Sequence, residues 1–228
     1  MEISVRDGRE VASGQLLDLY APRAGRAGGS VLLWHGSGPR QRSVMRTLAT
    51  KIAERGLSVF VPDWSSDAED GGVSDLLRSY DFVVAERSTE RFVLAGWSAG
   101  AKAAIALALG ADEARQPRSV VAIAGRYGVR GRLGAASALQ MAAQPHAPVT
   151  IRLAHGLDDD GVPVEESRNL FEALSASSSP ADLTLVAADH AGVIGCIYDP
   201  EQDLCIPTED PSVMLAVDRV ASLFQLQA

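Results

Sequence analysis

Short, continuous runs of Val, Ile, Leu and Ala recur along the 228 residues, with stretches of helical spacing between them. A strand that is apolar at every position is buried on both faces, which is typical of a parallel sheet covered by helices. The predicted buried strands are residues 31–34, 57–61, 91–95, 119–124, 149–153 and 183–186. The predicted helices are residues 43–55, 73–87, 99–109, a short one around 135–143, 164–174 and about 211–224. The pattern therefore predicts an α/β fold, a three-layer α/β/α sandwich around a mostly parallel sheet.

The N-terminal part of the chain has a different pattern. Residues 2–6 and 16–20 alternate in polarity, which predicts an antiparallel hairpin at one edge of the sheet. The sequence contains no internal repeat and no long linker, so we expect residues 1–228 to form a single domain.

Composition excludes several classes of protein. Hydrophobic residues make up 46% and charged residues 22%, values typical of a folded domain. Lys and Arg number 21 against 29 Asp and Glu, a net charge of −8, which disfavours nucleic-acid binding. No apolar run approaches membrane-spanning length and the first residues do not resemble a signal peptide. We therefore expect a cytoplasmic protein that acts on a small molecule, away from membranes and nucleic acids.

Cys196 and Cys205 are the only two cysteines. No second pair of Cys or His lies near them at metal-ligand spacing, so no metal site is expected. A disulfide closing a short loop and two free thiols both remain open, and a reducing cytosol favours free thiols.

The segment Gly96-Trp97-Ser98-Ala99-Gly100 carries the strongest chemical signal. It contains Gly-x-Ser-x-Gly between an apolar strand and an Ala-rich helix. That context is the one a nucleophile elbow requires, because a sharp strand-to-helix turn exposes the serine hydroxyl. Ser98 is therefore the candidate nucleophile.

A serine nucleophile needs a base, and only four histidines exist. His35 and His155 each precede a glycine at a strand end, and His146 precedes a strand at the opposite edge of the sheet. His190 follows the last predicted strand, at the same edge as Ser98. Only His190 leaves room for the chain order serine, acid, histidine.

The acid is expected after the strand that precedes this last one. Asp158, Asp159 and Asp160 stand there together, and any one of them could accept the imidazole N–H. Asp189 competes, but as the direct neighbour of His190 in sequence it is poorly placed to support that ring.

A tetrahedral intermediate also needs N–H donors for its oxyanion. The Ala99 amide directly follows the nucleophile, and the Ser37 amide is the expected second donor, with Gly38 as an alternative. Gly38, Trp64 and Trp97 are the candidate substrate-binding residues, Gly38 because glycine lets the backbone approach the substrate closely and the two tryptophans as walls of the pocket.

These motifs together resemble the α/β-hydrolase superfamily, and within it small carboxylesterases and proteins similar to dienelactone hydrolases. The resemblance covers nearly the whole chain, through residues 17–22, 35–38, 61–63, 96–100 and 155–163 and His190. The family motif His-Gly-x-x-Asp-x-x-Val-Pro falls on His155, Gly156, Asp159, Val162 and Pro163. The resemblance thus selects Asp159 as the acid, and it makes His35 and His155 structural members of turn motifs.

The chain departs from its relatives in two places. Ser37 stands where esterases similar to hormone-sensitive lipase have a glycine, and neither cysteine is at the elbow, where dienelactone hydrolases proper use one.

The usual site of a cap domain, between residues 124 and 149, holds 24 residues (125–148), too few for a sizeable lid. Residues 191–211 form a long link, which either folds over the pocket or packs on the surface.

The resemblance implies a serine hydrolase that cleaves small carboxylic esters through Ser98, His190 and Asp159 and requires no cofactor. Thioesters, dienelactones and other lactones, and acyl transfer are alternatives for the same triad. A ligand-binding protein without catalysis is a third alternative. The sequence leaves the natural substrate and the oligomeric state, monomer or homodimer, open.

Overall fold

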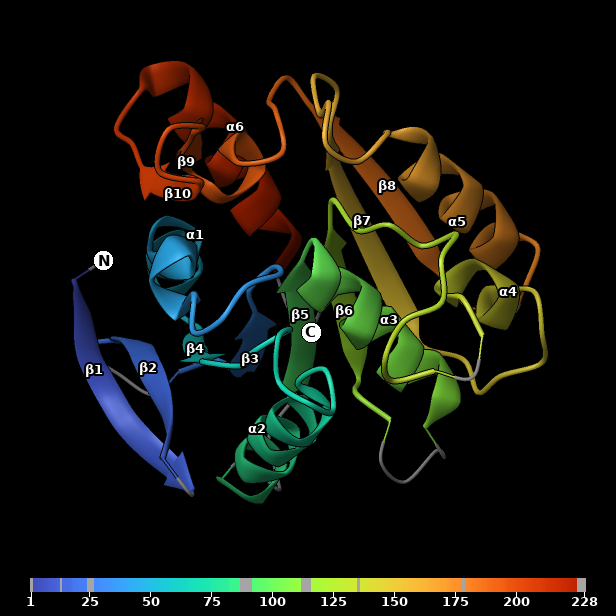
Figure 1. The fold of residues 1–228 in the computed structure, drawn as a ribbon, viewed down its shortest axis with the longest axis horizontal. Coiled ribbons are helices and arrows are strands. Elements are labelled where there is room, and N and C mark those ends of the chain that lie inside the picture. Colours follow the sequence, from blue (N-terminus) through green and yellow to red (C-terminus); the bar gives the residue numbers. More distant parts are fainter. Residues whose placement is uncertain are drawn as a thin grey trace.

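The computed structural model describes residues 2–12, 14–23, 27–86, 92–111, 116–134, 136–177 and 179–224. A central eight-stranded sheet has the strand order β1-β2-β4-β3-β5-β6-β7-β8 (Figure 1). Its strands are β1 (Ile3–Ala12), β2 (Gln15–Pro22), β3 (Ser30–Trp34), β4 (Ser58–Pro62), β5 (Phe92–Trp97), β6 (Ser119–Ile123), β7 (Thr150–Gly156) and β8 (Ala181–Val186). Neighbours from β4 to β8 are parallel, whereas β2 is antiparallel to both β1 and β4. The predicted, mostly parallel sheet with antiparallel edge strands is confirmed.

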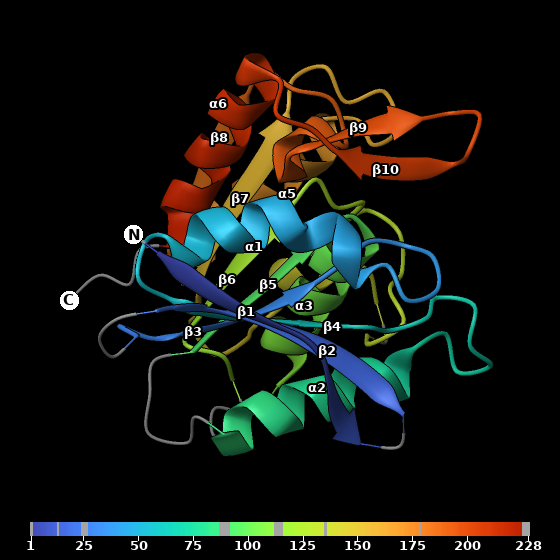
Figure 2. The same ribbon diagram turned by 90° about the vertical axis from the view of Figure 1, so that its left-hand side faces the viewer.

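Helices cover both faces of this sheet, as the two ribbon views show (Figures 1 and 2). On one face lie α1 (Arg46–Ala53) and α6 (Pro211–Ala221), which contact each other. On the other face lie α2 (Val73–Glu86), α3 (Ala99–Gly110), α4 (Ala138–Ala142) and α5 (Glu165–Ser175). None of the helices in the described ranges has the length and hydropathy that crossing a membrane requires. The three-layer α/β/α sandwich is thereby confirmed.

Strand β3 illustrates why the buried strands are apolar throughout. Successive side chains of a strand point to opposite faces. Val31 and Leu33 belong to the core cluster beneath α1 and α6, and Leu32 and Trp34 belong to the cluster beneath α2 and α3. All four side chains are completely buried. Both sides of the sheet therefore require apolar residues.

Most predicted elements have their expected places, and the differences lie at their ends. The predicted helix 43–55 begins as a 3-10 turn, η1 (Arg42–Met45), before α1. The predicted helix 211–224 likewise ends in a 3-10 turn, η3 (Ser222–Phe224). Residues 87, 91 and 135, which end or begin predicted elements, lie outside the described residues.

Connections after the parallel strands meet at one edge of the sheet. Strand β3 lies between β4 and β5. The chain passes from β3 to β4 on one side of it, and then crosses to β5 on the other side, so the order of the strands reverses at β3. Ligands of open α/β sheets bind beyond the carboxyl ends of the strands near such a reversal. Between β6 and β7 the described residues contain only the short helix α4, so no large cap covers this edge.

A small hairpin in residues 191–211 was not predicted. After the 3-10 turn η2 (Gly192–Ile194), β9 (Cys196–Asp199) pairs antiparallel with β10 (Leu204–Pro207) in a separate sheet. The hairpin extends to the right in the upper part of the molecule in Figure 2. Buried Cys196 donates to Val44 O (3.4 Å), which ties the hairpin to η1. Both cysteines are free thiols, and the register places Cys196 opposite Pro207 and Cys205 opposite Tyr198.

Candidate active site

Ser98 forms the turn between β5 and α3, with φ 55° and ψ −117°. A non-glycine residue at positive φ is strained and persists only where the surrounding structure enforces it. Here Gly96 and Gly100 allow strand and helix to approach closely. A Cβ on Gly96 would overlap the backbone of Gly100, and a Cβ on Gly100 would overlap the carbonyl oxygen of His35. The local sequence thus produces a sharp turn with the serine at its apex.

We expect Gly100→Ala to destabilise the fold by about 3 kcal/mol or more, because the new methyl group would meet immovable backbone. It would lie 2.6 Å from Trp34 O and closer still to His35 O. Urea unfolding followed by tryptophan fluorescence measures this change. Gly28→Ala is the matched control, since its nearest new neighbour is Gly56 O at 3.8 Å. A loss at Gly100 no larger than at Gly28 would contradict the close-approach argument.

His190 and Asp159 are joined directly. His190 Nδ1 donates to Asp159 Oδ2 at 2.6 Å. Because the carboxylate accepts this proton, Nε2 of the neutral ring is left as an acceptor. The loops that carry the two residues follow β7 and β8, and Leu157 N–H donates to Val186 O (2.8 Å) where they meet. Neighbouring parallel strands therefore bring together side chains that are 31 residues apart.

Four N–H groups surround the Asp159 carboxylate, and its side chain is completely buried. Oδ1 accepts from the amides of Gly161 (3.0 Å) and Val162 (2.7 Å). Oδ2 accepts from His190 and lies 3.2 Å from His155 Nε2. Burial raises the pKa of this carboxyl, but the hydrogen bonds from both histidines and from the Val162 amide outweigh burial and hold the pKa far below its usual range. Asp159 is therefore ionised beside His190.

Trp97 connects the nucleophile turn to His190. Its indole N–H donates to His190 O (2.9 Å), and the two rings lie 5.0 Å apart. Because Trp97 directly precedes Ser98, this contact places the elbow beside the histidine loop. No hydrogen bond joins Ser98 Oγ to His190 Nε2 within the described part of the chain; such bonds often tighten only when substrate binds.

Two backbone amides remain available at the expected oxyanion position. Ala99 is the first residue of α3, so its N–H has no partner within the helix. Ser37 is exposed, and its amide makes no hydrogen bond among the described residues. Gly38, the alternative donor, stands at φ 112° and donates its N–H to Ser66 Oγ (2.9 Å). Of these two candidates in the loop after β3, Ser37 is thus the one with a free amide.

Buried His35 fixes the loop after β3. Its Nδ1–H donates to Gly36 O (2.9 Å), and its Nε2 accepts from the amides of Trp64 (3.2 Å) and Gln41 (3.3 Å). Burial lowers the pKa of His35 to about 4, so the ring is neutral. The Trp64 ring stacks on it at 5.3 Å. The exposed fractions of Trp64 and Trp97 are 2% and 5%, so both tryptophans are mainly part of the core beneath the site.

The remaining candidates lie elsewhere or point away. His146 precedes β7 at the opposite edge of the sheet, as expected. Asp158 and Asp160 are exposed, and Asp189 accepts the Gly192 amide (2.6 Å) at the start of η2. Across the described ranges, no group of three or more His, Cys, Asp or Glu is arranged to hold a metal ion.

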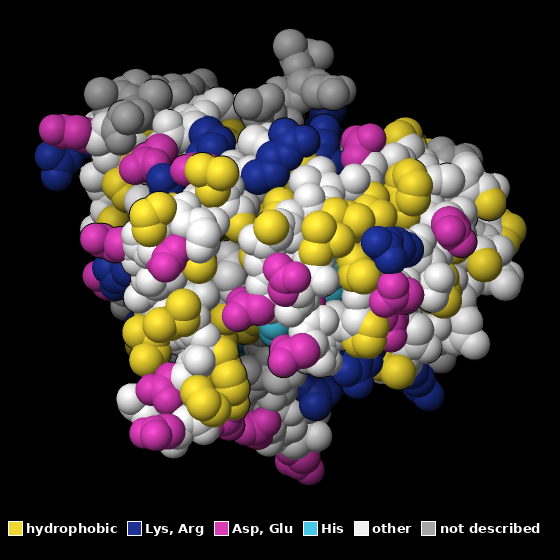
Figure 3. Space-filling model, turned by 90° about the horizontal axis from the view of Figure 1, so that it is seen from above, with side chains coloured by type: hydrophobic (Ala, Val, Ile, Leu, Met, Phe, Trp, Pro, Cys, Tyr) yellow, Lys and Arg dark blue, Asp and Glu magenta, His cyan; other side chains and the backbone are white. Residues whose placement is uncertain are grey.

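Figure 3 views the molecule from the edge at which β7 and β8 end. Histidine atoms are visible near the middle of this face, with acidic and hydrophobic side chains around them. Arg126, in the loop after β6, donates to Gly161 O (2.8 Å) and so braces the loop that carries Asp159. The face around the visible histidine atoms thus combines hydrophobic side chains with several carboxylates.

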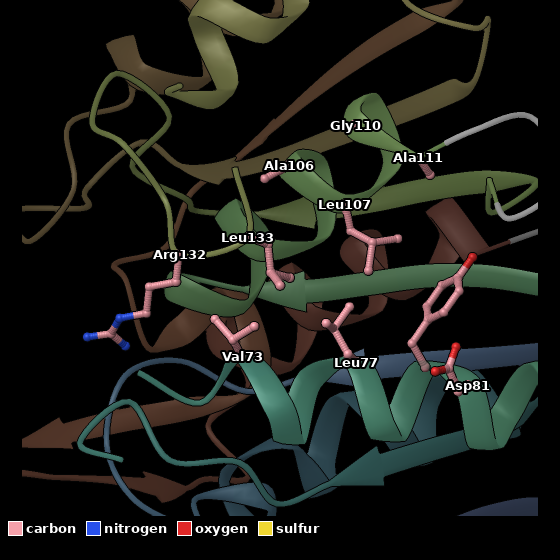
Figure 4. A pocket seen from close by; sticks show the side chains of 10 residues that line it. Val73, Leu77, Asp81, Ala106, Leu107, Gly110, Ala111, Arg132 and Leu133 are labelled. Carbon is pink, nitrogen blue, oxygen red and sulfur yellow. The ribbon is translucent and has the colours of Figure 1, made fainter. Parts of the chain in front are cut away.

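A separate cavity of about 510 Å³ lies between α2 and α3 (Figure 4). Apolar side chains such as Leu77 and Leu107 line it, with Arg132 toward one end and Asp81 toward the other. Its α3 residues begin eight positions after Ser98, or about 12 Å away at 1.5 Å per residue. This cavity is therefore distinct from the candidate site.

One contact in the site was missed by sequence reasoning. His155 was expected only to shape a turn, yet its Nε2 lies beside the same carboxylate oxygen that His190 contacts. The spacing His155-x-x-x-Asp159 was visible, but the direction of the ring depends on α5, which supplies Ser167.

Comparisons with known proteins agree with this architecture. The sequence model of the alpha/beta hydrolase family matches residues 31–225. The fold is similar to that of a dienelactone hydrolase from Anabaena variabilis, with 20% identity, TM-score 0.65 and coverage of 98% of this chain and 96% of that one. It is also similar to a thermophilic esterase from Thermogutta terrifontis solved with propionate bound, with 16% identity, TM-score 0.70 and coverage of 96% and 91%.

The same esterase phosphorylated by paraoxon matches with 19% identity, TM-score 0.69 and coverage of 97% and 91%. No curated relative matches the sequence significantly. Since the family model spans most of the sequence and the fold agrees with it, the chain belongs to the alpha/beta hydrolase family.

Proposed function

We propose that this protein is a serine hydrolase that cleaves small carboxylic esters through Ser98, His190 and Asp159. The observation that carries the proposal is the 2.6 Å hydrogen bond from His190 to a buried, ionised Asp159, at the same sheet edge as a strained serine. An imidazole oriented in this way is a general base, and a serine at such a turn is an exposed nucleophile.

Acylation would begin with attack of Ser98 Oγ on the ester carbonyl carbon. His190 Nε2 takes the hydroxyl proton, and the Asp159 carboxylate stabilises the imidazolium that forms. The amides of Ser37 and Ala99 donate to the oxyanion of the tetrahedral intermediate. When the intermediate collapses, the bond between the carbonyl carbon and the alcohol oxygen breaks, and His190 returns its proton to the leaving alcohol.

Deacylation repeats these steps with water. His190 Nε2 removes a proton from a water molecule, whose oxygen attacks the acyl carbon. The bond to Ser98 Oγ breaks, and His190 returns the proton to the serine. The products are a carboxylic acid and a regenerated enzyme.

Neutral esters suit this site better than anionic ones. The exposed carboxylates of Asp158, Asp160 and Asp189 stand next to Asp159 and His190 in sequence, and the chain carries a net charge of −8. They disfavour an anionic substrate through like-charge repulsion. The names of the similar structures, an esterase and a dienelactone hydrolase, are consistent with open-chain esters and lactones. Rates on a matched ester, thioester and lactone of one acyl chain separate the alternatives.

Labelling with a fluorophosphonate probe tests the nucleophile. We expect one equivalent of label on Ser98 of the wild type, and none on Ser98→Ala. Labelling of His190→Ala should be slower by about 10²-fold or more, because the hydroxyl loses its general base. The choice of probe is supported by the similar esterase that paraoxon phosphorylates.

His146→Ala is the control for histidine replacement, since His146 lies at the opposite edge of the sheet. It should label like the wild type. A folded wild type that takes up no label would overturn the proposed function in favour of a ligand-binding protein. Label that persists in Ser98→Ala would overturn Ser98 as the nucleophile and point to another residue.

A further inference from the structure

His155 is a fully buried side chain that the proposed steps do not use. Its Nδ1 lies 2.7 Å from Ser167 Oγ, and its Nε2 lies 2.9 Å from Val162 O and 3.2 Å from Asp159 Oδ2. The carbonyl and the carboxylate can only accept, so Nε2 carries the proton. Nδ1 then accepts the hydroxyl proton of Ser167. Both nitrogens of the buried ring are thereby satisfied in a single orientation.

We infer that His155 is a positioning residue for Asp159, an inference that rests on the proposed function. Its Nε2–H is hydrogen-bonded to Val162 O and lies 3.2 Å from Oδ2, the same oxygen that receives the proton of His190. The opposite oxygen is held by the amides of Gly161 and Val162. Rotation of the carboxylate would break three hydrogen bonds and move Oδ2 away from the His155 N–H, so these contacts fix the direction in which the carboxylate presents Oδ2 to His190.

The contacts form a closed ring around the turn. Val162 N–H donates to Asp159 Oδ1, and Val162 O accepts from His155, whose N–H also reaches Asp159 Oδ2. Ser167, in the first turn of α5, orients the far side of the imidazole. Strand β7, the acid loop and α5 thus all contribute to the orientation of one carboxylate.

A purely structural His155 and a positioning His155 predict different kinetics. If the ring only supports the turn, its loss lowers stability and leaves kcat of the folded enzyme unchanged. If it positions Asp159, its loss lowers kcat beyond any effect on folding while KM changes little, because substrate does not touch it. Small displacements of groups near the reacting atoms cost up to about 10²-fold in rate.

The test compares His155→Met with His155→Gln. Methionine fills similar space without a strong donor, whereas the glutamine amide can direct an N–H to the position of Nε2. We expect His155→Met to lower kcat for a small ester by roughly 10- to 100-fold with KM within about twofold. The glutamine variant should recover most of kcat. Leu170→Ala, a buried change one turn along α5 from Ser167, is the control that lowers the melting temperature without changing kcat.

A double-mutant cycle with Asp159→Asn then asks whether His155 acts through Asp159. We expect His155→Met to have almost no further effect on kcat once Asp159 is asparagine. If His155→Met does not fold, Ser167→Ala takes its place in the cycle, because it frees the imidazole to turn; a kcat loss of roughly three- to tenfold is then expected.

The inference is overturned if His155→Met keeps the wild-type kcat, or if His155→Gln and His155→Met lose kcat equally. It is also overturned if the loss of kcat in the double mutant equals the product of the losses caused by His155→Met and Asp159→Asn alone. Ser98→Ala is measured alongside. An active Ser98→Ala would mean that the proposed function itself is wrong. An inactive Ser98→Ala with a fully multiplicative cycle would remove only the role of His155.

Discussion

Replacing Ser98 with alanine should lower kcat/KM for a small carboxylic ester by about 10⁴- to 10⁶-fold, the range typical of nucleophile removal in serine hydrolases. No other hydroxyl takes its place at the apex of the turn, where φ is 55°. The residual rate should come only from binding and from the amides that stabilise the oxyanion. Steady-state hydrolysis of a chromogenic short-chain ester measures the loss.

Stability separates loss of chemistry from loss of fold in this experiment. Alanine differs from serine by one oxygen atom, and Ser98 is only partly buried, so the free energy of unfolding should change by about 0.5 kcal/mol or less. Ser177→Ala, at the end of α5, should hydrolyse the ester like the wild type. Retention of more than about one-hundredth of the activity in a freshly purified Ser98→Ala preparation would contradict the proposed nucleophile.

Replacing Asp159 with asparagine should lower kcat by about 10⁴-fold. Each carboxylate oxygen faces two N–H donors, from Gly161 and Val162 on one side and from His155 and His190 on the other. An asparagine NH₂ group would therefore oppose donors in either orientation. If it faces His190, the imidazole turns to the other tautomer and Nε2 can no longer accept the serine proton.

Asp158→Asn and Asp160→Asn are matched controls for this change. Both residues are exposed neighbours of Asp159, and their hydrolysis rates should stay within about threefold of the wild type. A loss at either position as large as that at Asp159 would identify a different acid.

The same variant should change the pH dependence of stability. The folded-state pKa of Asp159 is depressed below its unfolded value of about 3.9, so the carboxylate stabilises the fold fully above that value. This stabilisation is lost as the pH falls toward the folded-state pKa. The difference in free energy of unfolding between wild type and Asp159→Asn should therefore shrink between about pH 5 and pH 3. Denaturant unfolding at several pH values measures it, and a constant or growing difference would contradict the ionised state of Asp159.

Much of the fold could be predicted because its signals are local. The continuous apolar runs give buried strands, as the opposite-facing side chains of β3 illustrate, and residues 16–20 give part of β2, which lies next to the edge strand β1. The β9–β10 hairpin was missed because its strands have four residues each and its packing depends on η1, far away in sequence.

The candidate site divides in the same way. The sequence by itself determined the elbow, since glycines at positions 96 and 100 and the strand and helix around them are local requirements of a sharp turn. It also limited the base to one of four histidines. Spacing alone left three neighbouring aspartates open.

The family motif selects Asp159, and the tertiary structure shows its carboxylate in contact with His190. Only the tertiary structure decided which amide after β3 is free and which way the His155 ring points. Each depends on contacts between segments that are distant in the chain: β7 beside β8, Ser66 beside Gly38, and α5 beside β7. Side-chain direction at a loop is set by the hydrogen bonds that the surrounding elements supply, and local sequence does not encode those partners.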